Sequence, residues 1–412
     1  MLATVLMGVF GAFVAANALL ALCYWKDLRR LWREPVLKYP VLIIESDDWG
    51  PGPEEHAGLL LRLTDLLQQY RDAAGRRPVM TLGLALALPD RQRIKDDGFR
   101  RHHRITLADE RFSSVREAML NGVEQGVFSL QLHGMEHYWP ESIMKAATVN
   151  EEVRQWLLAD AYPSTEALPP RLQSRWVDAA SLPSTPLTKE ACQQAASEEA
   201  EAFADILGMK PAVAVPPTFV WNPAVEQGWK TAGVEVVVTP GRRYEARGGN
   251  GELLATDGPI LSGGHSACGQ LYLVRDDYFE PALGHTAEAA LAALENKSRM
   301  GRPTLVETHR FNFTGDAVEA EASFSTLADV LEKAIQLYPD LCFMATEELA
   351  RKIKAGDASL VMSHGAMRVQ KVLARVRRMP KFWRLARMTG AAFFAGICLK
   401  LLATKTAARE MS

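Results

Sequence analysis

Short runs of apolar and β-branched residues alternate with longer amphipathic stretches along most of this chain. The short runs predict buried strands at residues 39–47, 78–86, 127–133, 212–216, 234–239, 270–274, 303–308 and 341–345. The amphipathic stretches predict helices at residues 54–72, 113–125, 189–207, 222–232, 286–299, 323–337 and 346–355. Continuous apolar strands, each followed by a helix, are typical of a parallel sheet with helices outside. Seven or eight such units predict a distorted TIM-like (β/α) barrel, with an open doubly wound sheet as the alternative.

Two insertions interrupt this repeat. Residues 138–186 contain three tryptophans and six prolines, and residues 241–269 are rich in glycine. Long aromatic loops beside a barrel mouth usually shape substrate binding, although Trp156 or Trp176 could instead pack inside the protein. We therefore expect one barrel domain over residues 26–363.

The first 25 residues carry no charged side chain. A helix over residues 2–25 would be about 36 Å long, enough to cross a hydrocarbon core of about 30 Å. A cleaved signal peptide is the alternative, but no Lys or Arg precedes the run, and the run is long for one. The pattern therefore predicts a transmembrane anchor. Basic residues follow it and place the remaining chain in the cytoplasm, at the inner (plasma) membrane: Lys26, Arg29, Arg30, Arg33 and Lys38.

The other end of the chain is strongly basic. Residues 364–412 hold eleven Lys and Arg but one acid, whereas the first 363 residues hold 36 basic and 48 acidic residues. An amphipathic stripe at residues 369–379 is interrupted by Pro380, and an apolar stretch at 388–403 follows. We interpret residues 364–412 as helices at a membrane surface, or partly inserted in it, with membrane lipids as partners. A second span at 388–403 is the less favoured alternative.

Composition adds only a few limits. The 412 residues carry a net charge of −2, and 48% of them are hydrophobic, which excludes a disordered chain and a polytopic transporter. The near-neutral total and the amphipathic tail argue against a nucleic-acid partner. Five cysteines without a CxxC pair make a disulfide-stapled secreted domain a poor fit.

Polar residues gather where the predicted strands end, which is where barrel enzymes keep their chemistry. Asp47 and Asp48 end the first strand, His133 and His137 end the third, and His309 ends a later one. Two histidines with one carboxylate suit a divalent metal that keeps an open position for water. Asp48, His133 and His137 are the expected ligands. Asp47 would then act as a general base and His309 as the acid that protonates the leaving group.

Each of these motifs has a simpler explanation when it is taken alone. An Asp-Asp pair commonly caps a helix or forms a turn, and two histidines four residues apart are often no site at all. A lone histidine such as His309 is usually a hydrogen-bonded structural residue. The metal site is favoured because all three motifs fall at predicted strand ends, in an order that fits one barrel mouth.

The same motifs resemble the polysaccharide deacetylase (NodB-homology) superfamily over roughly residues 39–350. The resemblance rests on the strand leading into Ser46–Gly50, on His133-x3-His137, on the Pro216-Pro217 strand end and on Val306-x2-His309. The Asp-Asp-aromatic-Gly segment is also similar to YdjC-type oligosaccharide deacetylases, but the spacing of the histidines favours the first group. The resemblance implies a metal-dependent carbohydrate esterase or amidase, usually with zinc. It assigns the five residues the same roles.

One position departs from the family pattern. The arginine that orients the base, about two residues before the proline, is replaced here by Ala214. Arg242, Arg243 or Arg310 are candidates for its replacement from elsewhere in the chain. Candidates for contacts with the sugar are Trp49, Pro217, Trp221 and Asn312, although either tryptophan could belong to the core.

These features together predict a deacetylase that removes an N-acyl group from an amino sugar, carried on a lipid at the cytoplasmic membrane face. An extracytoplasmic deacetylase acting on a polysaccharide or peptidoglycan is the first alternative. A catalytically silent sugar-binding protein is the second, and Ala214 is the reason to consider it. A glycoside hydrolase is disfavoured because the chain offers no evident second carboxylate of the required pair.

Overall fold

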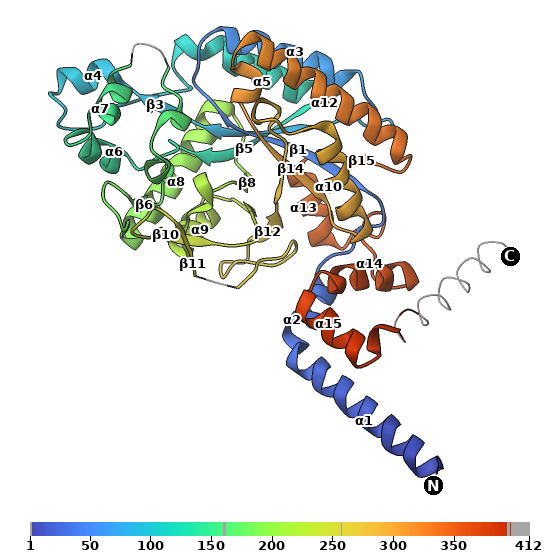
Figure 1. Ribbon diagram of the computed structural model, residues 1–412. Helices are drawn as coiled ribbons and strands as arrows, with labels where there is room; N and C mark the ends of the chain where they lie inside the picture. Colours follow the sequence, from blue (N-terminus) through green and yellow to red (C-terminus); the bar gives the residue numbers. More distant parts are fainter. Residues whose placement is uncertain (1, 160–161, 257, 394–395, 397–412) are drawn as a thin grey trace.

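A parallel sheet forms the centre of the protein in the computed structural model, which describes residues 2–159, 162–256, 258–393 and 396 (Figure 1). The strands along the sheet are, in spatial order, β12 (Leu271–Val274), β9 (Val236–Thr239), β8 (Val213–Ala214), β5 (Phe128–Gly134), β2 (Met80–Ala85), β1 (Val41–Trp49), β14 (Thr304–His309) and β13 (Asp277–Tyr278). A further strand, β15 (Cys342–Phe343), pairs with the start of β1. Every pair within this sheet is parallel, so the α/β prediction is confirmed.

The two ends of this strand path are joined by the chain itself. β12 pairs with β9, and β13 pairs with β14, but only Arg275 and Asp276 separate β12 from β13. One continuous segment therefore contacts both edges of the sheet. This arrangement is consistent with the expected distorted barrel, and it places Arg275 at the point where the two edges meet.

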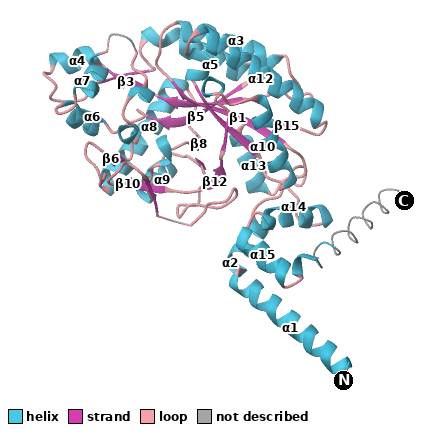
Figure 2. Ribbon diagram, viewed as in Figure 1, coloured by secondary structure: helices cyan, strands magenta, loops and turns pink. Residues whose placement is uncertain are grey.

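Helices cover the outside of the sheet (Figure 2). They are α3 (Glu55–Gln68), α5 (Ser113–Glu124), α8 (Lys189–Leu207), α9 (Pro223–Thr231), α10 (Ala287–Arg299), α12 (Ala317–Leu337) and α13 (Thr346–Ala355). The bounds of α8 and α13 are those predicted from the sequence. α12 begins six residues earlier than expected, because the Asp316 side chain accepts a hydrogen bond from the Val318 amide and caps the helix there.

Alternation along β1 divides the core into two layers. Leu42 and Ile44 pack with the helices outside the sheet, whereas Val41 and Ile43 pack with β8, β9, β12 and α13 on the other side. All nine residues of β1 are buried, as expected for a strand that is covered on both faces. Successive side chains point to opposite faces, so Glu45 and Asp47 continue the inner row begun by Val41 and Ile43.

The insertion at residues 138–186 is a small folded unit rather than a loop. It contains α6 (Pro140–Ala147) and α7 (Glu151–Leu158), and its own apolar cluster includes Trp156. Trp176 packs in the main core, so both tryptophans are structural. Buried Arg175 ties the unit to the barrel through Glu136 at 2.6 Å and Glu199 at 2.7 Å.

The remaining short elements lie in the connections between the barrel units. They are β3 (Ala87–Pro89), α4 (Arg91–Asp96), β4 (Arg104–Thr106), β6 (Val177–Asp178), β7 (Thr185–Pro186), β10 (Tyr244–Arg247), β11 (Leu253–Ala255) and α11 (Phe311–Thr314). β10 and β11 form an antiparallel hairpin within the glycine-rich insertion.

Four helices from the two ends of the chain pack together beside the barrel (Figure 1). We call them the stalk: α1 (Leu2–Cys23), α2 (Trp25–Arg33), α14 (Ala366–Arg377) and α15 (Pro380–Met388). Tyr24 contacts Phe382 edge to face with ring centroids 5.3 Å apart, and the Thr389 hydroxyl donates to Asn17 Oδ1 at 2.8 Å. The sequence predicted both ends as separate membrane segments and did not predict that they pack together.

None of the described helices is both long enough and apolar enough to qualify as a membrane span. The transmembrane anchor expected over residues 1–25 therefore finds no support in the structure. This finding covers the described side chains only, and those at positions 1–3, 5, 6 and 9 are not among them. Most of the apolar stretch predicted at 388–403 also lies outside the described residues.

Arg375 on α14 fixes the stalk to the barrel. Its buried guanidinium donates to backbone carbonyls on both sides of the junction, including those of Met300 at 2.8 Å and Pro35 at 2.7 Å. It also lies 3.2 Å from Glu34. Burial lowers the pKa of Arg375 to about 10, against the opposing effect of Glu34. These carbonyls lie just before β1 and β14, so the stalk joins the barrel at the amino ends of its strands.

We expect Arg375→Gln to destabilise the protein by about 3 kcal/mol, because it leaves several buried carbonyls without their donor and removes one of the two arginines that pair with buried Glu34. Arg378→Gln, on the same helix turn but exposed with one side-chain bond to Asn296, should change stability by about 0.5 kcal/mol or less. Urea unfolding followed by circular dichroism measures both. Equal effects of the two substitutions would contradict the role given to Arg375.

Candidate active site

The end of β1 brings two adjacent carboxylates to the same side of the sheet. Neighbouring residues of a regular strand point to opposite faces, which would separate Asp47 from Asp48. Here the pairing of β1 with β2 shifts register between Ser46 and Trp49, and Asp48 has a left-handed backbone with φ of +67°. Such a bulge re-aims a side chain, and a non-glycine residue held in this conformation is common at functional sites. Both carboxylates thereby reach the barrel mouth.

Gly83 on β2 makes room for the first of these carboxylates. A Cβ atom at position 83 would lie 2.3 Å from Asp47 Oδ1 and 3.3 Å from Asp47 Cα. The site therefore requires a residue without a side chain at position 83 of β2.

The three expected metal ligands lie together. One ligand atom from each of Asp48, His133 and His137 falls within 4.8 Å of the others. His133 Nε2 is 3.3 Å and His137 Nε2 is 3.6 Å from Asp48 Oδ1. His133 Nδ1 lies 2.9 Å from the Val215 carbonyl, which accepts its proton and leaves the Nε2 lone pair directed at Asp48. The hydrogen bond to the Val215 carbonyl thus holds His133 in the tautomer that a metal ligand needs.

The polar atoms of this triad fit a bound cation. Asp48 Oδ1 and His133 Nε2 are buried and form no hydrogen bond in the structure, although they face each other. Burial opposes ionisation of Asp48, but His137 and His133 outweigh it and hold the pKa of Asp48 well below its usual value. Burial lowers the pKa of His137 to about 4, so its imidazole is neutral at neutral pH. An ionised carboxylate with imidazoles is the donor set of a zinc-type site with open positions.

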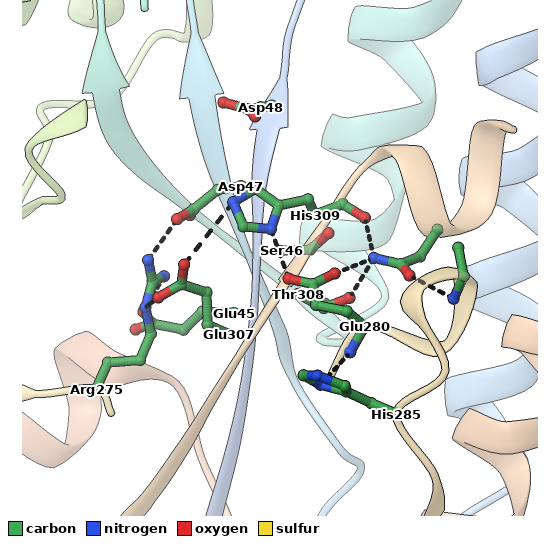
Figure 3. Close-up of polar contacts among 12 residues, drawn as sticks. Glu45, Ser46, Asp47, Asp48, Arg275, Glu280, His285, Glu307, Thr308 and His309 are labelled. Atoms are coloured by element: carbon green, nitrogen blue, oxygen red, sulfur yellow. Dashed lines mark hydrogen bonds and ion pairs between the residues drawn. The ribbon is translucent and has the colours of Figure 1, made fainter. Parts of the chain in front are cut away.

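Arg275 contacts three carboxylates near Asp48 (Figure 3). Its guanidinium lies 2.5 Å from Asp47 Oδ2, 2.7 Å from Glu45 Oε2 and 3.0 Å from Glu307 Oε2. Burial alone would raise the pKa of Asp47, but Arg275 and then His133 reverse the effect and lower it. Asp47 is therefore an ionised carboxylate whose second oxygen, Oδ1, has no hydrogen-bond partner. That oxygen is free to accept a proton.

Arg275 provides the arginine contact to Asp47 that was not expected from position 214, where this chain has alanine. The three arginines considered as replacements lie elsewhere. Arg243 pairs with Glu226 and Glu245, and Arg310 lines a cavity beside His309. Arg242 offers its carbonyl to the Thr239 hydroxyl. The expectation for these three residues is therefore wrong, because the closure of the strand path brings a residue from between β12 and β13 to the base.

His309 ends β14, the strand that pairs with β1, and its position is in register with Asp47. A further carboxylate holds its side chain. Its Nδ1 is 2.6 Å from Glu280 Oε1 (Figure 3). One ligand atom from each of Asp47, Glu307 and His309 falls within 4.8 Å of the others. Burial disfavours the charged imidazole, but the hydrogen bond to Glu280 and the nearby carboxylates outweigh it and raise the pKa of His309 to about 10. His309 is thus an imidazolium at neutral pH, as a general acid must be.

The residues expected to contact a sugar are mostly structural. Trp49 and Trp221 expose none of their surface, and their indole N–H groups donate to Ser46 at 2.8 Å and Glu226 at 2.9 Å. Neither forms a wall for a sugar ring, because both rings lie in the core. Pro217 is also buried.

Asn312 is fully buried too, and it has a positioning role instead of a substrate contact. Its amide donates to Glu280 and, at 3.1 Å, to the Thr308 hydroxyl. Asn312 therefore fixes the carboxylate that holds His309.

Three features of the site were not predicted from the sequence: Arg275, Glu280 and Gly83. Arg275 and Glu280 both follow β12, a strand too short to indicate which side of the barrel its end would reach. Gly83 lies in the middle of a predicted strand, where a glycine often marks a close approach of another chain segment. That glycine was the one available signal.

No known family pattern matches the sequence, and no curated protein is similar to it. Solved structures that are similar to this chain include a family 4 carbohydrate esterase from Streptomyces lividans (12% identity, 76% of this chain and 95% of that chain, TM-score 0.35). A peptidoglycan deacetylase from Bacillus subtilis is similar at 11% identity, over 77% of this chain and 93% of that one, with a TM-score of 0.36.

A 4-alpha-glucanotransferase from Thermococcus litoralis is similar at 10% identity and a TM-score of 0.42. The match covers 76% of this chain but only 40% of the glucanotransferase. The chemistry of this chain is therefore inferred from its own residues.

We expect Glu280→Gln to move the alkaline limb of the pH–rate profile to lower pH. The substitution removes the charge and the hydrogen bond that raise the pKa of His309, so the imidazolium loses its proton earlier as the pH rises. The profile of kcat/KM against pH, measured with the metal-loaded protein, tests this. Glu288→Gln, an exposed change on α10, is the control. An alkaline limb that stays in place would show that Glu280 does not tune His309.

Proposed function

We propose that the protein is a metal-dependent carbohydrate deacetylase that hydrolyses the amide of an N-acylated amino sugar. One observation carries the proposal: a carboxylate base held by Arg275 and an imidazolium acid held by Glu280 flank a triad of metal ligands at one barrel mouth. Base and acid on two sides of an electrophilic centre are what amide hydrolysis requires.

Asp48, His133 and His137 would hold the cation, which we propose to be Zn²⁺. Bound there, it supplies Lewis acidity toward the substrate carbonyl and lowers the pKa of water. Asp47 Oδ1 accepts a proton from the attacking water as the new C–O bond forms. His309 then gives its proton to the amide nitrogen as the C–N bond breaks, so a carboxylic acid and an amino sugar leave. Arg275 keeps Asp47 ionised and oriented throughout.

The catalytically silent alternative loses its main support. It rested on Ala214, and Arg275 now supplies the guanidinium that the base requires.

The test is acyl release from N-acetylated glucosamine oligomers by protein reconstituted with Zn²⁺. His133→Ala should lose both bound metal and activity. Asp47→Asn should keep the metal but lose about 10²–10⁴-fold in kcat, the usual contribution of a general base. His364→Ala, outside the barrel mouth, is the control. Full activity in either site variant, or a wild-type protein that binds no divalent metal, would contradict the proposal.

We further propose that the stalk rests on the cytoplasmic face of the plasma membrane. Large apolar side chains are exposed along it: Phe10, Leu19, Leu22, Trp25, Trp32 and Met388. Basic residues of α2 and α15 lie beside them: Lys26, Arg29, Arg30, Arg33, Lys381, Arg384 and Arg387. Apolar insertion combined with attraction to anionic lipid is how interfacial helices bind membranes.

The stalk joins the barrel at the amino ends of the strands, whereas the site lies at their carboxyl ends. Asp48 lies seven residues after Val41 along β1, which is about 23 Å of strand. The mouth therefore opens away from the proposed membrane. A lipid-linked substrate would therefore have to present its acylated sugar about 23 Å or more above the bilayer surface, at the mouth of the barrel.

Vesicle sedimentation tests the membrane proposal. We expect the protein to bind vesicles that contain phosphatidylglycerol, and Trp32→Glu combined with Met388→Glu to weaken this binding about tenfold or more, since both changes place charge on the apolar face. Leu253→Glu with Leu283→Glu, which alters exposed leucines on the barrel, is the matched control. Equal binding by both double variants would overturn the proposal, as would wild-type protein that stays in solution.

A further inference from the structure

A cavity of about 530 Å³ opens beside the candidate site, between the segments that follow β1 and β14. The insertion at 138–186 closes it through Tyr162 and Glu166. Phe311 lines it from the β14 side and stacks on His309, with ring centroids 5.7 Å apart and 15° between the planes. The cavity is therefore separated from the proposed general acid by one stacked ring, and its size suits a sugar unit.

Arg310 contributes the one arginine of this lining, and the proposed mechanism does not use it. Its backbone is fixed, because its amide donates to the Asp47 carbonyl at 2.9 Å. Its guanidinium makes a long 3.4 Å contact with the Pro51 carbonyl. Among the described residues it forms no ion pair within 4 Å. Most N–H donors of this guanidinium have no acceptor within the described part of the chain, and it lies next to His309 in the sequence. Such a group is suited to bind an anion of the substrate.

We propose that Arg310 is a specificity-determining residue that binds an anionic substituent, a phosphate or a carboxylate, next to the acylated sugar unit. The proposal rests on the proposed deacetylase function and names a property of its substrate. The sugar itself would lie against the rings of Phe311 and Tyr162, and its anionic group would reach the guanidinium.

Glu166 and His56 also line the cavity, and their ionisation influences the binding of an anion. Glu166 is the carboxylate of the lining, and it is exposed within the cavity. It opposes an anion, so its removal should favour anionic substrates, just as removal of Arg310 should disfavour them. Burial and then Arg310 lower the pKa of His56 to about 4, so His56 adds no charge at neutral pH.

The experiment compares acetate release from di-N-acetylchitobiose with release from the same disaccharide carrying a 1-phosphate. A third substrate carries a carboxylate instead, which separates the two sources of anionic charge. We expect wild-type protein to prefer an anionic form. Arg310→Gln should raise KM for that form about tenfold more than for the neutral disaccharide, and Glu166→Gln should lower it. Arg310→Lys should recover part of the loss, because the charge returns without the planar fork.

Arg351→Gln, an exposed change on α13 outside the cavity, is the control and should leave the preference unchanged. Equal shifts in KM for neutral and anionic substrates in Arg310→Gln would overturn the proposal, as would wild-type protein without a preference. Those results leave the deacetylase function in place. Absence of acetate release from all three substrates would instead refute the proposed function itself.

Discussion

The buried guanidinium of Arg275 is the interaction on which the candidate site depends. Three carboxylates, those of Glu45, Asp47 and Glu307, converge on it inside the barrel. Without it, their mutual repulsion and the cost of burying charge would protonate or expel them. Burial does raise the pKa of Glu45 and of Glu307, whereas Asp47 stays ionised. Against burial, Arg275 lowers the pKa of all three carboxylates, and His133 acts in addition on Asp47, which is the one whose pKa falls below its usual value.

The sequence predicted the periodic elements well because they depend on local pattern. α8 ends at Gly208, which adopts the left-handed conformation that favours glycine, so its boundary was readable directly. The clustering of Asp48, His133 and His137 could also be predicted, since the strand ends of a parallel barrel converge on one face. The sequence did not show that Arg275 is the arginine that contacts Asp47. That contact depends on which two edges meet when the sheet closes. No local pattern around Arg275 encodes that pairing.

Errors about the tryptophans have a different physical origin. Trp49 follows a proposed ligand, so its position in the sequence favoured a role in substrate binding. The bulge that turns Asp48 toward the mouth returns the next residue to the outer face of β1, where Trp49 joins the helix-covered core. One distortion of the backbone therefore explains both the paired carboxylates and the burial of the indole.

A second group of possible metal ligands, Asp47, Glu307 and His309, lies beside the first, and it would suggest a two-metal centre. Asp47 and Glu307 already pair with Arg275, so its fixed guanidinium neutralises the charge that a second metal cation would otherwise neutralise. His309, the third, is committed to Glu280. In the proposed mechanism, the charges around the mouth would be balanced by one exchangeable cation at Asp48, His133 and His137 and by the guanidinium of Arg275. This division would leave Asp47 as a free base in the proposed mechanism rather than as a metal ligand.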